Sequence, residues 1–289
     1  MSVRSLLRNY YYMTKPGIVR GNIVYTIAAF LLASKGDFFL TTFLAVVIGT
    51  ALVIASACVV NNYIDRHIDK KMERTKKRAL VTGAVSGRAA AYYAVILGII
   101  GFTVLILFTN TLTFVVGIVA YVFYVLIYGW AKRVSYHGTL VGAIPGALPP
   151  VAGYVAVSGV IDLGALLIFC VIVFWQMPHF YAISIYRHDD YKAAGIPVIS
   201  VVRGVSATKR AIMWYILAFL IAALCLAVAG YTGIIYLFTM LAVGALWFIL
   251  GMRGLRAPNS HRWAKMMFRF SLIVTLVFSV LISVDNLLI

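Results

Sequence analysis

The most chemically suggestive part of the sequence is a run of polar residues that recur at every fourth position. Asn61, Asp65, Asp69 and Glu73 follow an apolar stretch that ends at Val60. In an α-helix this spacing stacks the side chains on one face, about one turn apart. Amide and carboxylate oxygens are hard ligands that suit Mg²⁺, whose octahedron is completed by substrate phosphates and water. The pattern therefore predicts a magnesium site at a helix end.

Basic residues follow this acidic run at once. Arg74, Lys76, Lys77 and Arg78 could cover a polyanion that is bound to the metal. The alternative for the basic residues is a charged loop that only marks a cytoplasmic segment. For the carboxylates we favour a ligand site, because the 289 residues contain only eight Asp and Glu.

A second polar cluster follows a later apolar run. Arg187 and Asp190 lie just past that run, as Asp65 lies just past its own, four predicted spans earlier. We therefore expect two carboxylate-bearing helix ends to face one another across a shared cavity, like a clamp that holds metal ions on one diphosphate.

Between the two clusters lies a short aromatic and basic segment. Tyr128, Lys132 and Arg133 fall at the predicted end of another span. They could hydrogen-bond a phosphate, or they could belong to an interfacial aromatic belt with topology-setting charges. The sequence leaves both interpretations open.

The elements that carry these residues are predicted to be membrane-spanning helices. The sequence is 63% hydrophobic and 11% charged, whereas soluble domains carry about 25% charged residues. A span needs roughly 20 apolar residues. Cutting the chain at charge clusters and at Gly, Pro and Asn gives nine segments, over 17–34, 40–63, 89–109, 112–130, 139–158, 163–185, 211–230, 234–251 and 265–284. The predicted fold is all-α, one polytopic domain over 1–289, with nine transmembrane helices around a central cavity that opens to the cytoplasm.

The distribution of the 25 Lys and Arg residues predicts the orientation of the spans. Only Lys35 falls on one side, and the others lie near the N-terminus or in 64–88, 131–138, 186–210 and 252–269. Cytoplasmic loops are rich in Lys and Arg, so we expect a cytoplasmic N-terminus and an outer C-terminus. The net charge of +17 then reflects topology and not nucleic-acid binding. The cytoplasmic loops 64–88 and 186–210 carry the acidic motifs.

The segment 139–158 does not have the pattern of a straight helix. It contains Pro145, Pro149 and Pro150 together with glycines, and proline inside a helix removes a hydrogen bond and kinks the helix. A broken backbone at membrane depth would line a cavity. The alternative is a packing helix whose glycines allow close approach.

Together these features describe a site for a substrate with a diphosphate head and an apolar tail. Metal ions and cations stabilise the negative charge on a diphosphate leaving group. The 17 Phe, 18 Tyr and 5 Trp residues can stabilise an allylic cation with their aromatic faces. A dry cavity would protect that cation from water until the acceptor reacts.

On these motifs the chain resembles the UbiA superfamily of intramembrane prenyltransferases. The superfamily pattern is Asn61-x-x-x-Asp65-x-x-x-Asp69 followed by Lys71-Met72-Glu73-Arg74-Thr75-Lys76, then Tyr128-x-x-x-Lys132 and Asp190-Tyr191. Further motifs are similar to the branch that farnesylates haem: Thr14-Lys15-Pro16-Gly17, Asn61-Asn62-Tyr63-Ile64-Asp65-Arg66, Trp175-Gln176-Met177-Pro178-His179 and Asp190-Tyr191-x-Ala193-Ala194-Gly195-Ile196-Pro197. The resemblance covers nearly the whole chain.

The resemblance implies an activity, a cofactor and residue roles. The implied reaction transfers the farnesyl group of farnesyl diphosphate to a vinyl group of haem B, with addition of water, in a bacterial cytoplasmic (inner) membrane. The implied cofactor is Mg²⁺, and hand-over of haem O to a haem A synthase or a terminal oxidase would follow. The implied catalytic residues are Asp65, Asp69 and Asp190, which with Asn61 would hold the metal. The implied diphosphate-binding residues are Asn61, Arg74, Lys77, Arg78, Tyr128, Lys132 and Arg187.

Two positions depart from the family pattern. His67 stands where the family commonly has an acidic residue, which reduces the local negative charge. Ala194 stands where other members often carry a second aspartate, although the haem branch shares this feature. The second departure weakens the case for a symmetric site with two Mg²⁺ ions.

His179 is the candidate contact with haem. It lies inside an apolar span with Gln176 one turn before it, and polar residues at such depth usually face the bundle interior. Neutral imidazole is the usual axial ligand of haem iron. We expect His179 to contact the porphyrin, with His137 and His188 as weaker candidates. The alternative is a structural histidine that is hydrogen-bonded to a neighbouring helix.

Other functions fit parts of the pattern. The closest is a UbiA-type enzyme that uses a quinone precursor or another aromatic acceptor. A transporter could use 139–158 and His179 as its pathway, but the other spans contain almost no ionisable residues. A CDP-alcohol phosphotransferase is also membrane-embedded, but its D-G-x-x-A-R signature is absent from the sequence.

Overall fold

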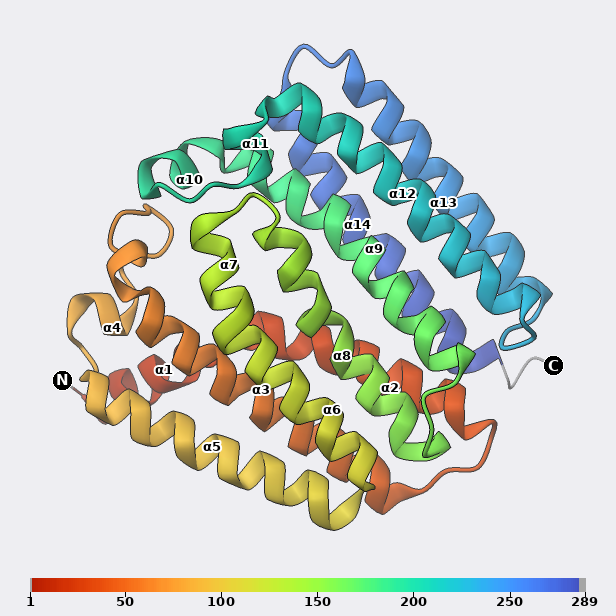
Figure 1. Cartoon of the computed structure of the whole chain (residues 1–289), viewed down its shortest axis with the longest axis horizontal. Helices are drawn as coiled ribbons and strands as arrows, with labels where there is room; N and C mark the ends of the chain where they lie inside the picture. Colours follow the sequence, from red (N-terminus) through yellow and green to blue (C-terminus); the bar gives the residue numbers. More distant parts are fainter. Residues whose placement is uncertain (1, 286–289) are drawn as a thin grey trace.

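The protein is a bundle of long helices, seen in a computed structural model that describes residues 2–285 (Figure 1). Nine helical segments among these residues are long and apolar enough to cross a membrane. They are α2 (Pro16–Ser34), α3 (Leu40–Asp69), α5 (Gly87–Phe108), the continuous Thr111–Val134, α8 (Gly138–Ser158), α9 (Leu163–Tyr186), α12 (Gly204–Val228), α13 (Ile234–Leu255) and α14 (Ser260–Val284). The described residues form no strand. The prediction of an all-α polytopic protein is confirmed.

Four short helices lie together at one end of the bundle, on the left and upper left of Figure 1. They are α1 (Val3–Met13), α4 (Ala79–Thr82), α10 (His188–Ala194) and α11 (Ile199–Val202). The sequence-based spans stopped too early at this end, because α3 continues to Asp69, α12 begins at Gly204 and α14 begins at Ser260. A helix keeps its hydrogen bonds beyond the apolar layer, so a hydropathy boundary does not mark its end.

The interior of the bundle is formed mainly by α3, α8 and α9, which are the most enclosed of the long helices. By contrast, α5 and the segment Thr111–Val134 present most of their apolar side chains outward. An apolar outer surface is expected where lipid replaces water as the solvent. Asn61, Asp65 and Asp69 lie on the enclosed helix α3 and His179 lies on α9, whereas Tyr128 and Lys132 belong to the less enclosed segment Thr111–Val134.

The helix α8 runs unbroken through its three prolines, so the interpretation of 139–158 as a broken segment is wrong. Its glycines lie where neighbouring helices approach most closely. A Cβ atom at Gly146 would collide with Gln176 on α9, and one at Gly153 would collide with the backbone of Thr26 on α2. Small residues at such crossings let helices pack in a membrane.

One element was not expected from the sequence. The segment Thr111–Val134 consists of α6 (Thr111–Val122), a π-helical turn η1 (Phe123–Tyr128) and α7 (Gly129–Val134). A π turn contains an extra residue, which rotates the following helix, and such turns are frequent at functional sites. Here it sets the direction of Tyr128, whose ring packs where a Cβ at Gly142 would lie.

Candidate active site

The end of α3 carries the first acidic motif on a continuous helix. Asn61, Asp65 and Asp69 are buried, with 3%, 8% and 5% of their surface exposed. Their stacking on one helical face is confirmed. Glu73 does not join them, because α3 ends at Asp69 and Glu73 forms an exposed salt bridge with Lys76 (2.6 Å) in the following loop.

Two cations from α7 meet Asp65. Lys132 Nζ forms a salt bridge with Oδ2, and Arg133 Nη2 lies 3.0 Å from Oδ1. Lys132 also lies 5.1 Å from the centre of the Tyr128 ring. The structure thus brings Asp65 to Tyr128, Lys132 and Arg133, which lie more than sixty positions further along the sequence. The buried Asp65 carboxylate thus has two cationic partners, which offset the cost of burying its charge.

Asp69 is paired with a cation from the loop that follows α3. Arg78 Nη1 lies 2.5 Å from Asp69 Oδ2 and 3.2 Å from Asn62 Oδ1. Asn62 donates in turn to the carbonyl oxygen of Met13 at 2.8 Å. This chain of hydrogen bonds attaches α1 to the acidic face of α3.

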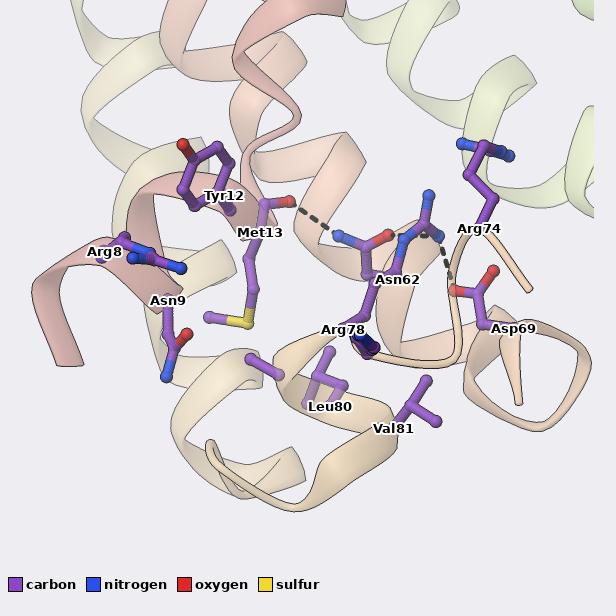
Figure 2. A pocket seen from close by; sticks show the side chains of 12 residues that line it. Arg8, Asn9, Tyr12, Met13, Asn62, Asp69, Arg74, Arg78, Leu80 and Val81 are labelled. Carbon is purple, nitrogen blue, oxygen red and sulfur yellow. Dashed lines mark hydrogen bonds and ion pairs between the residues drawn. The ribbon is translucent and has the colours of Figure 1, made fainter. Parts of the chain in front are cut away.

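Figure 2 shows the pocket beside this chain, with a volume of about 240 Å³. Its walls come from α1, the end of α3 and the segment 74–81. Besides Asp69 and Arg78, its charged lining residues are Arg8, Arg74 and Lys77. Four cations against one carboxylate suit an anionic ligand. The pocket lies at the end of the bundle beside α1, and the central cavity expected from the sequence stays a prediction.

Lys15 is a site residue that the sequence did not single out as a ligand. It precedes α2 in the left-handed conformation (φ 52°), and its Nζ donates to Asn61 Oδ1 at 2.7 Å. Burial lowers the pKa of Lys15 from 10.5 to about 8; Arg78 and Lys132 also lower it, whereas Asp65 opposes this shift. The only available signal was the Lys-Pro pair at the start of the first span.

The second cluster lies at the same end of the bundle. Arg187 Nη1 lies 3.6 Å from Asp190 Oδ2 at the start of α10, and in this long ion pair the arginine is exposed whereas the aspartate is largely buried. Burial raises the pKa of the next residue, Tyr191, while Arg74 and Arg187 oppose the shift. Because Arg74 follows α3, its effect on Tyr191 places the two clusters near one another.

The carboxylates of the two clusters do not form one compact group. Among residues 2–285 no set of three His, Cys, Asp or Glu side chains could hold a metal ion by itself. Asp65 and Asp69 share one helix face, and Asp190 lies on a separate short helix. A metal here would need oxygen ligands from a bound substrate, which is the usual situation for Mg²⁺.

His179 is buried among aromatic rings, with 9% of its surface exposed. Its ring stacks on Trp175 at 4.9 Å, and its Nδ1 lies 2.7 Å from Ser271 Oγ on α14. Ser271 Oγ donates to the carbonyl oxygen of Phe268 (2.7 Å), which can only accept. The hydrogen between His179 and Ser271 therefore belongs to Nδ1, and in the neutral ring Nε2 carries the lone pair.

The Nε2 atom of His179 has no hydrogen-bond partner among the described residues. This atom is accessible, whereas Nδ1 of His188 is fully enclosed. His137 is exposed, and its ring contacts that of Tyr136 in a tilted arrangement with the ring centres 4.0 Å apart. Of the three candidate histidines, His179 thus combines a fixed tautomer with an accessible lone pair.

The fold and the site define an intramembrane prenyltransferase, and comparison with known proteins agrees. The UbiA prenyltransferase family model matches residues 22–273, so the chain belongs to this family. It is 47% identical over 281 residues to protoheme IX farnesyltransferases from Yersinia pseudotuberculosis serotype O:1b (strain IP 31758) and Edwardsiella ictaluri (strain 93-146). Each comparison covers 97% of this chain and 95% of the relative.

Solved structures share the fold at low sequence identity. A UbiA homologue from Aeropyrum pernix K1 has a TM-score of 0.74 at 23% identity and covers 92% of this chain and 98% of its own. A UbiA homologue from Archaeoglobus fulgidus bound to GPP and Mg²⁺ has a TM-score of 0.65 at 16% identity and covers 95% and 99%. At these identities the likeness establishes the fold alone.

Proposed function

We propose that the protein transfers the farnesyl group of farnesyl diphosphate to a vinyl group of haem B, with addition of water, and so makes haem O. The observation that carries the proposal is 47% identity over 97% of the chain to protoheme IX farnesyltransferases. The buried acidic face of α3, with its surrounding cations, is where such an enzyme would bind the diphosphate.

The residues at the end of α3 fit Mg²⁺ as the cofactor. Asp65 and Asp69 offer buried carboxylate oxygens one helical turn apart, and Asn61 offers an amide oxygen. Bound Mg²⁺ would neutralise charge that develops on the leaving diphosphate. Asp190 would join from α10. The Archaeoglobus homologue that binds GPP together with Mg²⁺ supports the same cofactor here.

The cations at this site would exchange partners when the donor binds. Lys132, Arg133 and Arg78 now pair with the buried carboxylates. A diphosphate offers them stronger anionic partners, and charge-assisted hydrogen bonds to phosphate oxygens are short and strong. The carboxylates then become available to the metal, so donor and metal should bind together.

The remaining diphosphate contacts come from the pocket and the neighbouring helices. Arg74 and Lys77 line the basic pocket, and Arg187 lies next to Tyr191 at the same end. Tyr128 lies beside Lys132 and can donate its hydroxyl hydrogen to a phosphate oxygen.

The acceptor would be recognised by His179. A histidine that ligates a metal usually donates its other ring N–H to an oxygen, which fixes the ring orientation. His179 already does so through Ser271, and its Nε2 lone pair is accessible. This arrangement fits an axial ligand of the haem iron. His137 and His188 would have at most a peripheral role.

The enzyme would work in the bacterial cytoplasmic membrane with its acidic motifs facing the cytoplasm. The excess of Lys and Arg at that end of the bundle supports this orientation. Farnesylation makes haem more apolar, so direct hand-over to another membrane protein, such as a haem A synthase or a terminal oxidase, would keep the product out of water.

The proposal is tested with purified protein and His179→Ala. We expect the wild-type protein to convert haem B and farnesyl diphosphate into a more hydrophobic haem, as measured by chromatography and mass spectrometry. His179→Ala should lose haem binding in an absorption titration but still bind inorganic pyrophosphate with Mg²⁺. Conversion of a quinone precursor but not of haem B would instead assign an aromatic acceptor.

Ser271→Ala is the matched variant for the histidine. It removes the acceptor that fixes the His179 tautomer but keeps the ring, so haem affinity should fall about tenfold, within the range measured for outer-sphere partners of metal-bound histidines. An unchanged haem spectrum and affinity in His179→Ala would refute the ligand role.

A further inference from the structure

The proposed reaction needs one water molecule inside a site that must otherwise be dry. Water that enters freely would consume the allylic cation before the acceptor does. A defined water position near the acceptor would resolve this conflict. Buried polar atoms without a protein partner usually mark the position of such an ordered water.

Two such atoms lie on one face of α14. Thr275 Oγ1 and Ser279 Oγ are buried and have no hydrogen-bond partner among the described residues. Thr275 is 6% exposed and Ser279 is 3% exposed. They lie one and two turns from Ser271, which holds His179. The three hydroxyls form a stripe along α14 that is about 12 Å long at helical rise.

Other hydroxyls in the spans of this chain behave differently. Thr26, Ser34 and Ser283 each donate to the carbonyl oxygen four residues earlier, at 2.7–2.9 Å. That local bond is the usual way for Ser or Thr to satisfy its hydroxyl within a helix. Thr275 and Ser279 do not form this local hydrogen bond. Their hydroxyl groups are therefore available to a bound molecule.

The surroundings of the stripe provide enough polar partners for one water molecule. Side chains four residues apart on a helix lie about 5–6 Å from each other, so one water can bridge their hydroxyls. The Tyr25 hydroxyl on α2 lies close to Thr275 without completing a hydrogen bond of good geometry. Three polar partners are typical of a buried water.

The stripe also lies next to the acceptor side of the proposed site. The Tyr25 ring packs on Trp175 at 5.5 Å, and Trp175 stacks on His179 at 4.9 Å. Trp175 Nε1 donates to the carbonyl oxygen of Ser271 at 2.8 Å. One network therefore joins the water position to the histidine that would hold the haem.

We propose that Thr275 and Ser279 hold a buried water molecule that becomes the hydroxyl group of the product. This inference rests on the proposed function. C1 of the farnesyl group leaves the diphosphate and bonds to the terminal vinyl carbon, and the positive charge moves to the vinyl carbon attached to the porphyrin. The water oxygen bonds to that carbon, and its proton goes to the released diphosphate. If no water is in place, the same cation loses a proton and gives an alkene.

The test compares the double variant Thr275→Val/Ser279→Ala with Ser283→Ala, whose hydroxyl belongs to the same helix but donates to the Ser279 carbonyl oxygen. Mass spectrometry measures the ratio of hydroxylated product to product lighter by one water. We expect this ratio to fall about tenfold in the double variant, which corresponds to ~1.4 kcal/mol, and to stay unchanged in Ser283→Ala. Thr275→Ser keeps a hydroxyl and should keep the ratio. An unchanged ratio in the double variant overturns the proposal.

A second measurement does not depend on the reaction. Radiolytic footprinting oxidises side chains that contact bound water, so Tyr25 should be labelled in the wild-type protein and much less in the double variant. Equal labelling of Tyr25 in both proteins refutes the water site. If the wild-type protein makes no farnesylated haem, the proposed function fails, while the footprint still decides whether the water is present.

Discussion

Asp65 and Asp69 are buried carboxylates, and their burial is tolerated because Lys132, Arg133 and Arg78 balance their charge. A buried ion pair adds little net stability, but removal of one partner leaves an uncompensated charge and costs about 3–5 kcal/mol. Substitutions at these carboxylates are therefore expected to change stability as well as the proposed catalysis. Turnover and melting temperature therefore have to be measured on the same variants.

Asp65→Asn should lower turnover by about 100-fold or more, as expected when a group that supports transition-state charge is removed. It should also lower the melting temperature, because Lys132 and Arg133 lose their counter-ion. Adding Lys132→Met should recover part of the stability but none of the activity. Asp69→Asn and Asp190→Asn should also inactivate the enzyme.

The matched control for these aspartates is Glu73→Gln, since Glu73 is exposed in the loop beyond α3. It should remain close to wild type in steady-state assays. Full activity of Asp65→Asn at ordinary Mg²⁺ concentrations, or activity of the wild-type protein in EDTA, would contradict the metal assignment.

Lys15→Met tests whether Lys15, in the connection between α1 and α2, binds the diphosphate. The partly buried Lys15 has a neutral amide as its hydrogen-bond partner, so its ammonium group can donate to a phosphate oxygen without breaking a salt bridge. The variant should raise KM for farnesyl diphosphate about tenfold, the scale of one charged hydrogen bond. KM for haem should not change.

Lys15→Arg provides the comparison, because it keeps the charge and the same backbone conformation. It should restore part of the affinity for inorganic pyrophosphate in a calorimetric titration. Equal KM values for the donor in wild type and Lys15→Met would show that Lys15 does not contact the diphosphate.

At the scale of the elements, the site depends on how closely the helices approach α8. Gly153 faces the backbone of Thr26, which leaves no space for a Cβ atom, whereas a Cβ atom at Gly146 would displace the amide group of Gln176. The prolines of α8 kept the hypothesis of a broken segment open, but the neighbouring helices hold α8 as one helix. Two other glycines of α8 give room to the site residues, because a Cβ atom at Gly142 would collide with the Tyr128 ring and one at Gly138 with the backbone of Lys132.

Gly153→Ala should separate α2 from α8 and lower the melting temperature by several degrees, since overpacking typically costs about 1–3 kcal/mol. Gly21→Ala is the control on α2, because a Cβ there meets nothing within 4 Å and alanine favours a helix. It should leave the melting temperature unchanged or raise it slightly. Equal melting temperatures for the two variants would contradict the close approach, and thermal unfolding in detergent measures both.

At the scale of the whole molecule, the acidic motifs, the basic pocket and the short helices share one end of the bundle (Figure 1). Phosphate chemistry requires polar groups and cations, which a membrane accepts only near its surface. The other end has short connections and only one basic residue, Lys35. The charged groups of the molecule are therefore concentrated at one end of the bundle.

Reporter fusions test this orientation in cells. Fusions after Lys35, Asp162 and Gly233 should report the outer side, and fusions after Arg78 and Arg203 should report the cytoplasm, because cytoplasmic loops retain Lys and Arg. Alkaline phosphatase and fluorescent-protein fusions measure the two locations. A cytoplasmic signal after Asp162 would separate the two acidic clusters and refute the shared site.

The sequence by itself determined the features that depend on local periodicity. Long apolar runs define the nine spans, because crossing the hydrocarbon layer requires a minimum helix length. The fourfold spacing of Asn61, Asp65 and Asp69 defines one helical face whatever the helix packs against. The ends of the spans, the position of Glu73 beyond α3 and the continuity of 139–158 did not follow from the sequence. Hydropathy and proline content do not show where a helix stops when neighbouring helices support it.

Only the tertiary structure decided which distant residues meet. Lys132 reaches Asp65 across 67 positions, Lys15 reaches Asn61 across 46, and His179 reaches Ser271 across 92. Nothing in the local sequence of Ser271 indicates that it fixes the tautomer of a histidine. Such contacts depend on which faces the helices present to one another, and this is set by packing across the whole bundle, including the π turn before Tyr128 and the glycines of α8.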